Sequence, residues 1–123
     1  MRILITLPPR MYREAIALAI HQHRPGLVEV RVAPPEAAEG ELAGFRPHLL
    51  VHADADPIPA GALAGVPCRV EVLYSDSMDA RVISGDGVRE ARDMSMEGLL
   101  RAVDGAAALV ADREVGREAG SPG

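Results

Sequence analysis

Short runs of apolar, β-branched residues alternate along this chain with segments of helical pattern, and this alternation constrains the fold more than any other feature. Continuous apolar runs at residues 3–7 and 49–53 predict strands buried on both faces of a sheet. Residues 28–32 and 68–74 alternate apolar with polar positions, which predicts strands with one polar side. The segment between residues 9 and 24 repeats apolar side chains at helical spacing, which predicts an amphipathic helix.

Strands that alternate with helices at this spacing are typical of a parallel sheet with helices on both faces. We therefore expect an α/β protein with the three-layer α/β/α sandwich of a flavodoxin-like domain. The 123 residues suit one domain, which we place at residues 1–112, followed by a flexible polar tail at 113–123. In such sheets, ligands bind at the carboxyl ends of the strands, which here carry residues 7–9, 54–56 and 75–79.

Residues 79–92 have a hairpin pattern in place of a helical one. Two β-capable runs flank this segment's centre, where the pair Asp86-Gly87 is a strong turn signal. Ser95 then has the character of a helix N-cap. The last helix is expected to bury one apolar face, formed by Leu99, Leu100, Val103, Ala107 and Val110.

Composition narrows the classes of function. The formal net charge of −5 argues against a non-specific nucleic-acid or anionic-membrane binder. Cys68 is the sole cysteine, which excludes an internal disulfide and a cysteine-based zinc site. All 13 basic residues are arginine, so no reaction here can depend on a lysine ammonium group. The opening residues lack a signal-peptide pattern and no apolar run is long enough to span a bilayer, so we expect a cytoplasmic protein.

Three segments carry a family resemblance. Residues 3–15 read ILITLPPRMYREA, residues 46–53 read RPHLLVHA with Pro57 following, and residues 92–100 read RDMSMEGLL. This pattern resembles the receiver domain of two-component response regulators, in the LuxR/NarL-type branch, over about residues 2–110. The resemblance implies a receiver-like fold with a central parallel five-stranded sheet and a role in signal transduction. The family's fourth helix has no counterpart, because the hairpin pattern takes its place.

The positions that match the family's phosphorylation site lack its chemistry. The resemblance places Leu7 and Pro8 where two acids would hold Mg²⁺, and neither residue has a side-chain oxygen to offer. It places Ala53 where the phosphoacceptor aspartate would stand, and an alanine cannot form an acyl phosphate. The resemblance places Tyr74 or Ser75 where the family has a threonine, and Arg92 where the family has a lysine. The degenerate set is therefore Leu7, Pro8, Ala53, Tyr74, Ser75 and Arg92.

The acidic side chains near the strand ends, together with Arg92, suggest other kinds of binding site. Asp54 or Asp56 could act as a displaced phosphoacceptor, although aspartates beside prolines are common turn residues. Arg92 could contact an anion, or it could form an ion pair with a nearby aspartate. Oxygen ligands for a cation could come from four aspartates that are otherwise ordinary loop residues, Asp54, Asp56, Asp76 and Asp79.

The remaining residues of chemical interest have simpler interpretations. His52 lies within a predicted strand, where a hydrogen-bonded core histidine is the plainest interpretation. Cys68 begins a strand and is expected to pack as a small hydrophobic residue. The other histidines have no metal-ligand spacing, and no Ser-His-Asp pattern or phosphate-binding glycine loop occurs. We expect no catalytic residue, no metal and no cofactor.

These observations predict a stand-alone pseudo-receiver that binds another signalling protein without phosphorylation and contacts neither nucleic acid nor membrane. An exposed hairpin edge would also allow a homodimer. The alternative is a small-molecule or metal-binding domain that uses the loops at residues 54–56 and 75–79. A third hypothesis is a working phosphoreceiver that uses one of the displaced aspartates.

Overall fold

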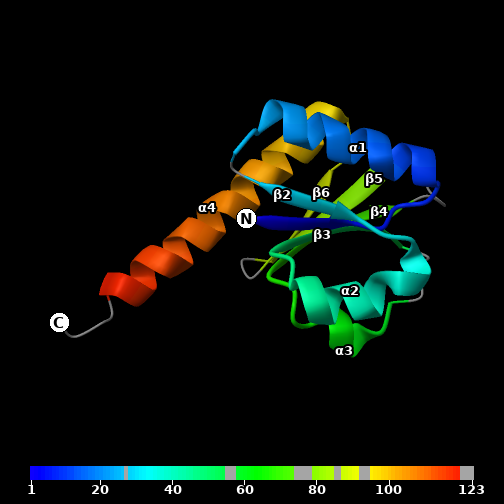
Figure 1. The fold of residues 1–123 in the computed structure, drawn as a ribbon. Coiled ribbons are helices and arrows are strands. Elements are labelled where there is room, and N and C mark those ends of the chain that lie inside the picture. The colour runs from blue at the N-terminus through cyan, green and yellow to red at the C-terminus, as the bar shows by residue number, and fades with distance from the viewer. Residues whose placement is uncertain (27, 55–57, 74–78, 85–86, 92–94, 120–123) are drawn as a thin grey trace.

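The computed structural model describes residues 1–26, 28–54, 58–73, 79–84, 87–91 and 95–119, and gives six strands and their connecting helices (Figure 1). The strands are β1 (Arg2–Ile5), β2 (Glu29–Val32), β3 (Leu49–Ala53), β4 (Cys68–Leu73), β5 (Asp79–Ser84) and β6 (Gly87–Ala91). The helices are α1 (Arg10–His23), the 3₁₀ turn η1 (Pro35–Ala37), α2 (Ala38–Phe45), α3 (Ala60–Leu63) and α4 (Met96–Ala119). None of the helices in these described ranges is long and apolar enough to cross a membrane.

The strands form one sheet in the order β2-β1-β3-β4-β5-β6. β1 is parallel to both of its neighbours, β2 and β3, and β4 is parallel to β3. β5 is antiparallel to β4, and β6 is antiparallel to β5. The expectation of a flavodoxin-like, receiver-like sheet of five parallel strands is therefore wrong.

The length of the connection between β4 and β5 explains this correction. Two parallel neighbours need a crossover of about a dozen or more residues, usually with a helix, to return the chain to the starting edge. Residues 74–78 alone separate β4 from β5, so the chain can only turn back and run antiparallel. β5 and β6 then form an antiparallel hairpin over the segment where the sequence predicts one, with Ser84 opposite Gly87 at its tip.

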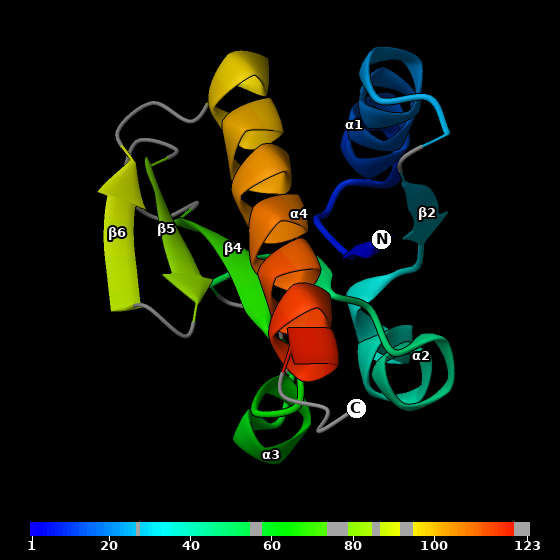
Figure 2. The same ribbon diagram turned by 90° about the vertical axis from the view of Figure 1, so that its left-hand side faces the viewer.

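Helices cover both faces of the parallel part of the sheet (Figure 2). Under α1 and α4, Ile16 and Val103 pack against the side chains of Ile3 and Val51. On the opposite face, beside α2 and α3, a smaller cluster joins Leu4, Leu42, Phe45 and Leu50. β3 is buried at every position: Leu49, Val51 and Ala53 enter the first cluster, and Leu50 enters the second from the other face.

α1 and α4 lie on the same face and are joined by an ion pair at their exposed sides. Nε and Nη2 of Arg24 each donate a hydrogen bond of 2.8 Å to an oxygen of Asp104. The hydrogen bonds from Arg24 hold the pKa of the Asp104 carboxyl below its usual value. The contact fixes the end of α1 against the middle of α4.

α4 begins as the sequence predicts but runs further. Ser95 caps its start, because the Ser95 side-chain oxygen accepts a hydrogen bond of 3.1 Å from the backbone N–H of Gly98. The helix continues to Ala119, into the segment expected to be a tail, and its last turns project beyond the sheet (Figure 1). The buried face also differs from the expected one, because Ala102 and Ala106 are buried where Ala107 is exposed.

The cluster beside α2 and α3 gives a direct test of the packing. We expect Leu50→Ala to lower the free energy of unfolding by about 2–5 kcal/mol, because Leu50 is fully buried at the centre of the sheet. Leu18→Ala is the matched control, since Leu18 is 58% exposed on α1 and its truncation should cost within about 0.5 kcal/mol. Urea denaturation measures both values, and equal losses would contradict this packing.

Candidate functional site

The carboxyl ends of the parallel strands, where the sequence places the site, are closed and apolar in the described residues. Leu7 and Ala53 are only 1% and 2% exposed. Pro8, the next residue after Leu7, is half-buried. The space between these strand ends and the start of α4 is about 30 Å³, and it is lined by apolar side chains such as Tyr12, Val72 and Met96. A space of that size holds about one water molecule and no substrate.

The acidic candidates do not gather into a site among the described residues. Asp54 is exposed after the end of β3, and its backbone N–H donates a 2.9 Å hydrogen bond to the carbonyl oxygen of Val72. Asp79 begins β5 opposite Leu73. No group of three or more possible metal ligands occurs in the part of the chain that the structure describes. The other candidates lie outside the described residues; they are Asp56, Tyr74, Ser75, Asp76 and Arg92.

Arg13 is a buried cation at the same strand ends that the sequence reading missed. It is 8% exposed, and its Nη1 donates a 3.3 Å hydrogen bond to the carbonyl oxygen of Leu7. No carboxylate of the described residues forms an ion pair with it. Its spacing from Ile16 and Ile20 on α1 places it on the buried face, and that periodicity was the available signal. Arg13 thus closes the end of β1 instead of opening a binding site there.

A row of polar side chains crosses the sheet on the face beside α3. The imidazole of His52 lies 3.0 Å from the carbonyl oxygen of Ala53 and 3.5 Å from Nη1 of Arg69. Glu71 pairs with Arg69 at 3.7 Å and with Arg81 at 3.6 Å. His52 is therefore buried with polar partners, as a core histidine should be. The single carboxylate of Glu71 is shared between the two guanidinium groups, so this row holds one more positive charge than negative charge.

A polar hollow of about 720 Å³ lies between α2 and α3 near the start of β1. Nε of Arg2 donates to the carbonyl oxygen of Arg46 at 2.9 Å, and Nδ1 of His48 accepts from the backbone N–H of Arg2 at 3.0 Å, so internal bonds hold Arg2 and His48. Arg46 ends α2 with a positive φ of 52°, a conformation usual for a helix C-terminus. These bonds give the three residues a structural role at the helix end.

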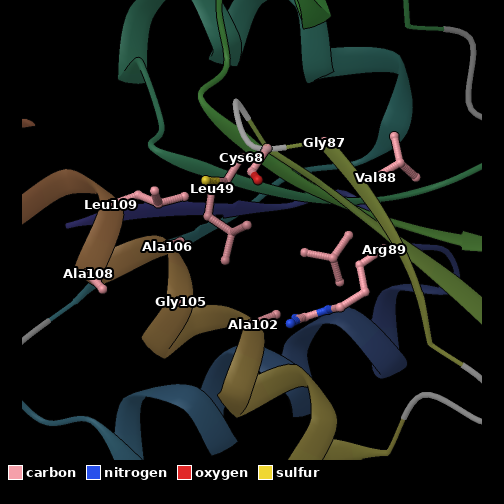
Figure 3. A pocket seen from close by; sticks show the side chains of 12 residues that line it. Leu49, Cys68, Gly87, Val88, Arg89, Ala102, Gly105, Ala106, Ala108 and Leu109 are labelled. Carbon is pink, nitrogen blue, oxygen red and sulfur yellow. The ribbon is translucent and has the colours of Figure 1, made fainter. Parts of the chain in front are cut away.

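An apolar hollow lies between α4 and the β5–β6 hairpin (Figure 3). We call it the hairpin groove. Its volume is about 390 Å³, and Cys68, buried at the start of β4, forms part of its floor. Arg89 of β6 reaches over the opening toward Ala102 of α4. The groove is lined by Leu49, Cys68, Val82, Ser84, Gly87, Val88, Arg89, Ala102, Gly105, Ala106, Ala108 and Leu109.

The hairpin groove lies at the amino ends of β3 and β4, whereas the sequence predicts a site at the carboxyl ends of the strands. Leu49 and Cys68 are the first residues of β3 and β4, whereas Leu7 and Ala53 mark the other ends of the parallel strands. The expectation that Cys68 packs as a hydrophobic residue is confirmed, since it is 3% exposed within the core cluster. The groove was missed because it exists only when β5 and β6 extend the sheet past α4.

Comparison with family models, curated proteins and solved structures finds no match for this chain.

Ala53→Asp tests whether the strand ends are closed. We expect this change to destabilise the fold by about 2–4 kcal/mol, because it places a carboxylate in an apolar, buried position. Asp54→Asn is the matched control at the next, exposed position, and it should change stability by less than about 0.5 kcal/mol. Both are measured by urea denaturation. An Ala53→Asp protein of unchanged stability would show that the strand ends are open to solvent.

Proposed function

We propose that this chain is a pseudo-receiver, a protein-interaction module of signal transduction that works without phosphorylation. The observation that carries this proposal is the closed, apolar state of the strand ends. The side chains of Leu7 and Ala53 are buried there, and neither can bind Mg²⁺ or accept a phosphoryl group. The receiver resemblance supplies the signalling context, although the sheet departs from the family's after β4.

Binding of a partner protein then depends on surface recognition alone. Without an acyl phosphate to shift its conformation, the module responds only to the concentration of its partner and to the affinity between them. The net charge of −5 favours a protein partner over nucleic acid or an anionic membrane. The outer side of the hairpin is the surface that supports this function best, since β6 is the last strand of the sheet.

Two other hypotheses make different demands on the strand ends. A cation or small-molecule site would need Asp54 to converge with other polar groups, and Asp54 is exposed. A working phosphoreceiver would need Asp54 or Asp56 together with a new Mg²⁺ site. A homodimer through the hairpin edge is compatible with the main proposal, because the partner protein would then be a second copy of this chain.

The proposal is tested by an amide NMR titration with Mg²⁺, followed by beryllofluoride, which mimics a phosphoryl group. We expect no saturable shift in the amides of Leu7, Ala53 and Asp54, because the described residues bring no cluster of oxygen ligands to the strand ends. A receiver with an intact aspartate site, titrated in parallel, is the positive control.

Either kind of saturable response contradicts the proposal and identifies what replaces it. Shifts with Mg²⁺ alone indicate a cation site. Shifts that need Mg²⁺ and beryllofluoride together indicate a phosphoreceiver, and Asp54→Ala and Asp56→Ala then show which aspartate accepts the phosphoryl group.

A further inference from the structure

β6 forms an outer edge of the sheet that the rest of the described chain does not cover. It pairs with β5 on one side and is the last strand in the order of the sheet. Val88, the second residue of β6, is 63% exposed, so the described chain leaves most of its side chain uncovered. An uncovered edge presents unpaired backbone N–H and C=O groups and is a template for another strand.

The geometry of the hairpin determines which backbone groups point outward. Ser84 and Gly87 are paired with only two residues between them in the sequence, and a hairpin pair this close in sequence is a hydrogen-bonded one. Hydrogen-bonded and non-bonded pairs alternate along an antiparallel ladder, so Arg89 bonds to β5 while Val88 and Glu90 do not. The N–H and C=O groups of Val88 and Glu90 therefore point away from the sheet.

The hairpin groove lies beside this edge and carries positive charge. Arg89 lies over the groove, and it forms no ion pair with any carboxylate of the described residues. Apolar side chains form most of the rest of the lining. The groove thus suits a ligand with apolar groups and a carboxylate.

We propose that β6 binds an extended segment of a partner protein as a seventh strand, in which an acidic side chain meets Arg89 and apolar neighbours enter the hairpin groove. This inference rests on the proposed interaction function and names its surface and the chemistry of its partner. Backbone hydrogen bonds to Val88 and Glu90 supply strand pairing, as in other cases of strand addition at a sheet edge. Residues two positions apart in the segment share one face, so the preferred pattern is apolar, any, acidic, any, apolar.

A second copy of the chain fits this edge less well. Two β6 strands related by a two-fold axis pair antiparallel, and paired residues share a face, so one residue must lie opposite its own copy. A register centred on Arg89 or on Glu90 places like charges opposite each other, which is destabilising. A register centred on Val88 pairs only residues 87–89 of each strand. The net charge of −5 on each copy also opposes association.

The probe for this proposal is the peptide acetyl-Val-Thr-Glu-Thr-Val-amide, titrated into ¹⁵N-labelled full-length protein. We expect saturable amide shifts in residues 87–91 and in the groove wall of α4, with no shift at Leu7 or Ala53. Methylation of the two threonine backbone nitrogens should weaken binding at least about tenfold, because it removes the strand hydrogen bonds while leaving the protein unchanged. Absence of shifts in β6, or shifts that survive this methylation, would overturn the proposal.

Variants of the protein test the two parts of the site separately. Arg89→Gln should weaken binding of the glutamate peptide about threefold to tenfold and leave binding of its glutamine analogue unchanged. Val88→Pro removes an outward N–H, which an edge strand tolerates, and should abolish binding, whereas the matched control Val88→Thr should retain it. Equal affinity of Val88→Pro and Val88→Thr for the peptide would contradict strand addition.

Sedimentation of the free protein tests the competing occupant. A monomer is expected, and a dimer in which Val88→Pro restores the monomer would assign the edge to a second copy and overturn the peptide proposal. These outcomes are separate from the titration of the strand ends, because a response there to Mg²⁺ and beryllofluoride would refute the phosphorylation-independent function while leaving β6 unaffected.

Discussion

The short connection between β4 and β5 is the constraint on which the functional surfaces of this protein depend. Residues 74–78 are too few for a crossover, so the chain returns antiparallel and adds a hairpin to the sheet. No helix lies between β4 and β6 in the described chain, and α4 follows only after the hairpin. α4 then packs on the parallel strands (Figure 2) and leaves the groove beside β5 and β6 (Figure 3). The hairpin groove and the uncovered edge of β6 thus both result from the shortness of the connection between β4 and β5.

The parallel part of the sheet forms the packed core that supports the hairpin groove and the edge of β6. β3 is buried on both faces, and the two hydrophobic clusters meet across it. At its carboxyl end, Ala53 and Leu7 are packed closely, and the guanidinium of Arg13 is bonded to the carbonyl oxygen of Leu7. The same packing that stabilises the centre of the fold therefore also places apolar side chains at the described strand ends.

Much of the fold could be predicted from the sequence because its signals are local. The apolar runs, the helix between Pro9 and Arg24, the N-cap at Ser95 and the hairpin turn each follow from a few neighbouring residues. The direction of β5 was predicted wrongly, because the alternation of strands and helices and the family resemblance both implied a parallel sheet, whereas residues 74–78 are too few for a crossover. The hairpin groove could not be predicted at all, since it joins the starts of β3 and β4, the tip of the hairpin and the middle of α4.

The central claim is that β6 is a formed strand with an open outer edge, and hydrogen exchange of its backbone amides measures this directly. The account predicts alternation: the Arg89 amide, bonded to β5, should exchange at least about tenfold more slowly than the outward amides of Val88 and Glu90. Slow exchange at all three positions would mean that the edge is covered in the free protein. Fast exchange at all three would mean that β6 is not paired with β5, and either result would contradict the account.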